Sequence, residues 1–152
     1  MRSVVLLAVV VAVGVSGPPL FASSIDENPA DAEAIAALEV RANQAQPREQ
    51  CFLYAQIVHQ MTELSMREYS AGNLDHATSL LRRIQGIAQK IHLSIAGNDK
   101  RLKNAEILLS HTAFRLNELL HSSSYDDREL VQQTLAQVNQ AQNEALMTVF
   151  KK

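Results

Sequence analysis

Three side chains that could bind a metal ion follow one another at helical spacing near the middle of the chain. His59, Glu63 and Met66 are separated by four and three residues, which places them on one face of an α-helix. Imidazole, carboxylate and thioether groups are ligands that copper or zinc accepts. The apolar residues of the same segment lie on the opposite face. We therefore expect the three side chains on a solvated surface, and the sequence predicts no metal site.

Motifs that carry common catalytic or cofactor chemistry are missing. The sequence has no glycine-rich phosphate loop, no nucleophile elbow and no paired-cysteine metal site. A di-iron bundle needs two inward Glu-x-x-His pairs, and a c-type haem needs two cysteines; the chain provides neither. We therefore expect a protein that is not an enzyme and that holds no cofactor.

The only cysteine, Cys51, cannot form an internal disulfide. It is in helical phase with the apolar residues Tyr54, Val58 and Met61, which predicts a small buried side chain in a core. A disulfide between two chains is the alternative, because a single cysteine in an exported protein can pair with a second copy.

A cluster of cations begins the predicted helix 99–121. Lys100, Arg101 and Lys103 lie in its first turn, where unsatisfied backbone N–H groups also attract anions. The cluster is a possible anion-binding site. The alternative, which we favour, is that these charges are solvated or paired locally, as Lys103 would be with Asp99 four residues earlier.

Two predicted helices carry apolar side chains on the face away from their core residues. These surplus residues are Phe52 and Met66 in the segment 48–71, and Ile107 and Phe114 in the segment 99–121. A short helix within 29–45, with a narrow apolar face, can cover one of the two surplus faces but not both at full length. The uncovered face is a candidate surface for a protein partner or for self-association.

The elements that position these residues are long amphipathic helices. Apolar residues recur in steps of three and four through 74–95 and again through 102–119, with a possible helix end at Gly97. This pattern predicts two helices folded back on each other as an antiparallel pair. Similar patterns in 48–71 and 124–150 complete an all-α, up-down-up-down four-helix bundle with an additional short N-terminal helix.

The segment 69–81, YSAGNLDHATSLL, resembles the middle of a tetratricopeptide repeat in its glycine, asparagine and alanine positions. The resemblance covers 13 residues and occurs once. A 34-residue period is absent, and the helices are longer than those of that repeat. We interpret the segment as a generic helical hairpin.

The first residues have the composition of a secretory signal peptide. Arg2 precedes an apolar run of about 12 residues, and small residues follow near Ala22 and Ser24. The run is shorter than the roughly 20 residues that cross a bilayer, although a retained anchor is the alternative. We expect a cleavable signal at 1–24, an acidic N-terminal arm with a short helix at 25–47, and the four-helix bundle at 48–152.

These features predict a periplasmic or extracellular, non-enzymatic helical bundle that acts through protein–protein interaction or self-association. The alternative is a periplasmic protein that binds a metal ion or an anion. Nucleic acid is not expected as a partner, because no aromatic residues are interleaved with the basic ones. No stable membrane span is expected after the signal is cleaved.

Overall fold

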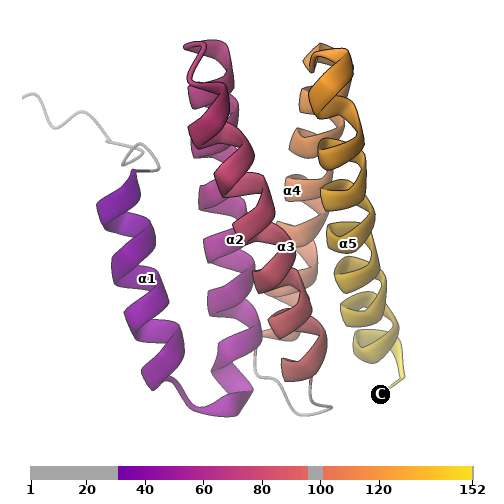
Figure 1. The fold of residues 1–152 in the computed structure, drawn as a ribbon. Helices are drawn as coiled ribbons and strands as arrows, with labels where there is room; N and C mark the ends of the chain where they lie inside the picture. The colour runs from indigo at the N-terminus through magenta and orange to yellow at the C-terminus, as the bar shows by residue number, and fades with distance from the viewer. Residues whose placement is uncertain (1–30, 96–100, 152) are drawn as a thin grey trace, which may run out of the picture.

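The computed structural model describes residues 31–95 and 101–151, and within these ranges the chain forms five α-helices and no strand. The helices are α1 (Ala32–Gln44), α2 (Pro47–Ser70), α3 (Leu74–Ser94), α4 (Leu102–Ser122) and α5 (Tyr125–Phe150). Four long helices form a bundle, and the shorter α1 lies along one side of it (Figure 1). The prediction of an all-α bundle with an additional short N-terminal helix is therefore confirmed. The predicted signal at 1–24 lies outside the described residues.

The helix starts follow local sequence signals. Asp31 accepts a hydrogen bond from the backbone N–H of Ala34 at 2.6 Å, which satisfies one of the exposed donors at the start of α1. Pro47 occupies the first turn of α2, where a missing N–H costs nothing. Ser124 begins α5 by accepting a bond from the backbone N–H of Asp127 at 3.4 Å.

The turn between α2 and α3 depends on Gly72. Its φ of 84° lies in the left-handed region, which a side chain makes unfavourable. This conformation lets the N–H of Asn73 reach the carbonyl of Glu68 at 2.9 Å and close the end of α2. The predicted helix end at Gly97 lies outside the described residues.

Replacing Gly72 by alanine is expected to lower the free energy of unfolding by about 1 kcal/mol. The cause is the backbone conformation alone, because a Cβ at Gly72 meets no atom within 4 Å. Gly86 is the matched control, since a Cβ there also meets nothing within 4 Å but the residue lies inside α3. Gly86→Ala should raise the free energy of unfolding by about 0.5 to 1 kcal/mol. Urea denaturation of both variants measures the two changes, and equal signs would contradict this account of the turn.

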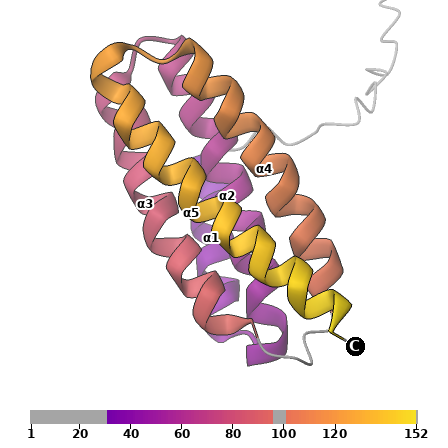
Figure 2. The ribbon, with the colours of Figure 1, turned by 90° about the vertical axis from the view of Figure 1, so that its right-hand side faces the viewer.

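The bundle consists of two antiparallel hairpins, α2–α3 and α4–α5, stacked side by side. Helix α2 lies beside α4, and α3 beside α5 (Figures 1 and 2). Each of these neighbouring pairs is parallel, because contacts advance together along both helices. In α2 and α4, His59 meets Thr112 and Glu63 meets Arg115. In α3 and α5, Gln85 meets Thr134 and His92 meets Glu144. Helix pairs of α-solenoids stack in the same manner.

The predicted antiparallel pairing of 74–95 with 102–119 is wrong. No Cα atom of α3 comes within 8 Å of one in α4, so these two helices lie diagonally across the bundle. Each helix has a single apolar stripe, and any arrangement that turns the stripes toward a common core buries them. The spacing therefore predicts the buried face of each helix but does not specify which helix lies next to it.

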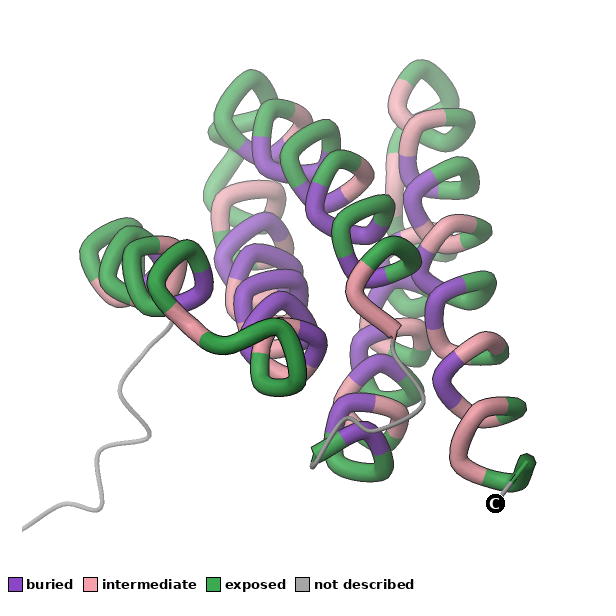
Figure 3. The backbone as a smooth tube through the Cα atoms, turned by 90° about the horizontal axis from the view of Figure 1, so that it is seen from below, coloured by how far each residue is buried: buried purple, intermediate pink, exposed green. Residues whose placement is uncertain are grey.

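Helix α2 is the most buried element, since it contacts α1, α3 and α4. Ten of its residues are buried, including the fully buried Cys51, which confirms the prediction of a small core side chain. Helix α1 packs on α2 through Ile35 and Ala42, and Glu39 forms an ion pair with Arg83 of α3 at 2.7 Å. Figure 3 shows the buried segments of the helices turned toward one another. Within the described ranges, none of the helices combines the length and the apolar composition of a membrane span.

Candidate binding surface

Helix α4 has two ridges of side chains on opposite faces. The inner ridge is completely buried and consists of Leu102, Ala105, Leu109, Thr112, Leu116 and Leu119. The outer ridge has the same 3-4-3-4-3 spacing, and each of its residues is exposed: Asn104, Ile107, His111, Phe114, Glu118 and His121. A repeated spacing of three and four residues is the pattern by which one helix packs on another. The outer ridge is therefore built like a second packing face, although no described helix covers it.

Two large apolar side chains stand at the centre of the outer ridge. Ile107 is 44% exposed and Phe114 is 64% exposed. Phe114 also borders an open hollow of about 310 Å³, which His59, His111 and Arg115 line with it. The hollow lies between α2 and α4, so the stacking of the two hairpins creates it.

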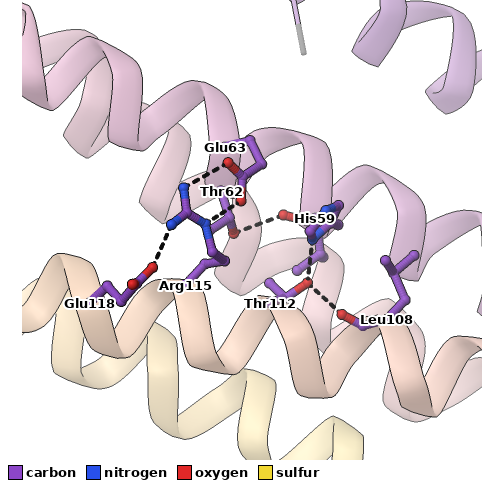
Figure 4. A network of polar contacts seen from close by, with 8 residues as sticks. His59, Thr62, Glu63, Leu108, Thr112, Arg115 and Glu118 are labelled. Atoms are coloured by element: carbon purple, nitrogen blue, oxygen red, sulfur yellow. Dashed lines mark hydrogen bonds and ion pairs between the residues drawn. The ribbon is translucent and has the colours of Figure 1, made fainter. Parts of the chain in front are cut away.

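The polar side of this hollow is an ion-pair network centred on Arg115 (Figure 4). Its Nε donates to Oε1 of Glu63 at 2.7 Å and its Nη2 to Oε2 of Glu63 at 3.0 Å, while Nη1 donates to Glu118. The hydrogen bonds from Arg115 lower the pKa of the Glu63 carboxyl group, and they raise the pKa of Arg115. The carboxylates of Glu63 and Glu118 already accept hydrogen bonds from three nitrogens of Arg115. Arg115 therefore joins α2 to α4 more than it attracts an anion.

His59 is fixed between the helices by a chain of hydrogen bonds. Its Nδ1 lies 3.1 Å from Oγ1 of Thr112, whose hydroxyl proton is donated to the carbonyl of Leu108 at 2.8 Å. The hydroxyl has one proton, so Nδ1 of His59 must be the donor of the first bond. Partial burial lowers the pKa of His59, with Arg115 and His111 acting in the same direction and Glu63 against it.

Lowering the pH from about 7.5 to about 5.5 is expected to reduce stability through His59. Because its folded-state pKa lies below the usual 6.5, the unfolded chain takes up a proton first, and stability is lost as the pH falls below 6.5. His59→Gln should remove part of the decrease in melting temperature between these two pH values. His121→Gln, which changes an exposed imidazole at the end of α4, is the control. An unchanged pH dependence in His59→Gln would contradict the predicted role of burial.

The structure separates the four predicted partner-surface residues into two groups. Ile107 and Phe114 remain exposed on α4. Phe52 and Met66 are half-buried and pack against the core. The ring of Phe52 also lies 5.1 Å from the guanidinium carbon of Arg101 at the start of α4. The surplus face of α2 is thus covered, partly by α4, whereas that of α4 is not.

The predicted solvated position of His59, Glu63 and Met66 is also wrong, because this face of α2 is turned toward α4. His59 bonds Thr112, and Glu63 bonds Arg115. Within the described residues, no group of three or more histidine, cysteine, aspartate or glutamate side chains is placed to hold a metal ion.

The possible anion site is described only in part. Lys100 lies outside the described residues, Arg101 stacks on Phe52, and Lys103 is exposed in the first turn of α4. Figure 1 shows that the starts of α2 and α4 and the ends of α3 and α5 lie at one end of the bundle. These segments contain Arg48, Lys90, Lys103 and Lys151. Acidic residues are gathered at the other end, where α5 begins with Asp126 and Asp127.

Three residues of the site, Thr112, Arg115 and Glu118, are not indicated as such by the sequence pattern. Thr112 belongs to the predicted core pattern, and Arg115 and Glu118 form an i, i+3 pair, but neither fact shows which residues of α2 they meet. Only the parallel placement of α2 and α4 brings them to His59 and Glu63.

Comparison of the chain with protein-family models, with curated proteins and with solved structures found no match.

Proposed function

We propose that the protein is an exported, non-enzymatic helical module that binds another protein chain on the outward face of α4. The observation that carries this proposal is the outer ridge of α4, in which Ile107 and Phe114 are exposed at packing-type spacing beside an open hollow. Single exposed apolar residues are ordinary. Ile107 and Phe114 are seven residues apart, and they lie beside a hollow that the half-buried His59 and Arg115 help to line. This arrangement is typical of the centre of an interface.

The chemistry of the hollow favours an apolar side chain of the partner. Phe114 contributes an aromatic ring, and His59 has a lowered pKa, which favours its neutral form. Arg115 is already held by Glu63 and Glu118. A hollow of about 310 Å³ is large enough for one large aliphatic or aromatic side chain. Lys103 at one end of this face and Glu118 at the other supply a polar rim.

The proposal of export depends on the composition of residues 1–24, which has the order of a charged start, an apolar run and small residues. A binding role also agrees with the absence of the common catalytic motifs from the sequence.

Photo-crosslinking in living cells tests the binding surface. A photoreactive amino acid is placed at position 107 or 114 of the full chain, and at positions 136 and 143 on the exposed face of α5 as matched controls. We expect a discrete crosslinked product from positions 107 and 114 and none from the two control positions. Equal labelling from all four positions, or no product from 107 and 114, would reject this face as the binding surface. Fractionation of the cells reports whether the product is outside the cytoplasm.

A further inference from the structure

The exposed face of α4 is self-complementary about a point midway between Ser110 and His111. Ile107 and Phe114 lie at equal distances on either side of this point, and Lys103 and Glu118 lie at equal, larger distances. These four side chains are exposed, and so are Ser110 and His111 at the midpoint. An apolar residue is thus matched with an apolar one, and a cation with an anion.

Such a pattern is what a twofold interface requires. In an isologous dimer the same patch serves both subunits, so each residue meets the residue on the opposite side of the axis. We propose that the chain bound on this face is a second copy of the same protein, with the two α4 helices packed antiparallel. This proposal rests on the proposed function, because it names the partner of the same surface.

The apolar pair forms the centre of the proposed interface. Ile107 and Phe114 are seven residues apart, or about 10 Å at a rise of 1.5 Å per residue. The antiparallel arrangement places Phe114 across from the partner's Ile107, and Ile107 across from the partner's Phe114. Four side chains then cover one another in a continuous apolar strip, and their exposure of 44% and 64% in the single chain is removed.

Charge selects the antiparallel direction. With the helices antiparallel, Lys103 lies across from the partner's Glu118, and the same contact is repeated on the other side of the axis. With the helices parallel and in register, lysine would face lysine and glutamate would face glutamate. The whole bundle has the same preference, because the basic end of one copy lies beside the acidic end of the other.

The remaining outward faces are less suited to this pairing. Helix α1 already covers one side of α2. The outward face of α5 has exposed amide side chains at Gln132, Asn139 and Asn143, and its exposed large hydrophobic residues lie at its two ends: Tyr125 at the start, Met147 and Phe150 at the finish. The exposed large hydrophobic residues of α3, Leu74 and Leu93, also lie at the two ends of that helix. The interface is therefore centred on α4.

The test is a charge exchange followed by sedimentation equilibrium of the full chain. The unaltered protein should be a dimer, and Phe114→Asp should be a monomer. Lys103→Glu and Glu118→Lys should each weaken the dimer by about 10- to 30-fold, because each replaces two attractive contacts with two repulsive ones. An equimolar mixture of the two variants should regain the dimer, because both contacts would then join a glutamate of one variant to a lysine of the other. The double variant Lys103→Glu/Glu118→Lys should regain it as well.

Each outcome decides the proposal. Recovery in the mixture supports the antiparallel α4 dimer, since damage to the fold of either variant could not be repaired by mixing; circular dichroism checks that both remain helical. An unaltered chain that is monomeric at about 100 μM, above the Kd of most specific complexes, overturns the proposal. So does a dimer that Phe114→Asp leaves intact, or a mixture that stays monomeric. If the unaltered chain is monomeric while position 114 still crosslinks to a different protein, the proposed function stands and the homodimer fails.

Discussion

Leu109→Ala is expected to lower the free energy of unfolding by about 3 to 5 kcal/mol, the largest loss that we predict for a single substitution. Leu109 is completely buried on the inner ridge of α4. Alanine at this position removes apolar contacts and leaves a cavity, because the surrounding helices relax only in part. Urea denaturation at constant pH measures the change.

The matched control is Ile107→Ala on the outer ridge of the same helix. Ile107 is 44% exposed, so its replacement should change the free energy of unfolding by less than about 1 kcal/mol. The measurement is made at low protein concentration, because association through the outer ridge would add to the stability of the unaltered chain. Equal losses from the two variants would mean that the outer ridge is part of the core.

Ile35→Asp is expected to detach α1 from the bundle and to lower the free energy of unfolding by about 2 to 4 kcal/mol. Ile35 is 1% exposed and packs in the common core through α2. A carboxylate at this position loses its hydration unless α1 moves away, so the local opening of α1 costs less than keeping it packed. Hydrogen exchange should show faster exchange of the α1 amides, while α3 and α5 keep their protection.

Val40→Asp is the control for this second prediction, since Val40 is on the same helix but 55% exposed. It should leave the exchange of α1 unchanged. Loss of protection throughout the bundle in Ile35→Asp would show that α1 is required for the whole fold rather than for covering one side of α2.

The buried face of each helix could be predicted from the sequence, but the neighbours of each helix could not. The spacing from Leu102 to Leu119 predicts the inner ridge of α4. The predicted pairing of 74–95 with 102–119 failed because a stripe on a helix carries no information on which stripe it meets. That choice depends on the packing of all the helices together.

For the candidate surface, the exposed residues of α4 could be predicted from the sequence, but those of α2 could not. Ile107 and Phe114 were predicted to be exposed because they lie opposite the inner ridge of their own helix, and they are. Phe52, His59 and Met66 were expected on an outer face of α2, but α2 packs against three other helices and has little outer face. The ion-pair network could not be predicted either, since its two helices contribute residues that lie 52 positions apart.

The parallel placement of α2 beside α4 is the basis of the binding surface, because it brings His59, Arg115 and Phe114 to one hollow. It also distinguishes this bundle from one in which every neighbouring pair is antiparallel. Paired cysteines joined by a short bifunctional thiol reagent can tell the two arrangements apart. Cys51 is completely buried and does not compete for the reagent while the chain is folded.

Two pairs that share one cysteine make this measurement. The first is Glu63→Cys with Arg115→Cys, across α2 and α4. The second is Gln85→Cys with Arg115→Cys, across α3 and α4. Gln85 lies at the same level along the bundle as the middle of α4. It bonds Thr134 of α5, and Gln142, eight residues further along α5, bonds Glu106 of α4. Because α5 is antiparallel to α4, Thr134 is level with residues about eight positions after Glu106. The structure predicts rapid joining of the first pair and none of the second. Joining of the second pair with no reaction of the first would place α3 beside α4 and contradict the stacked hairpins on which the proposed surface depends.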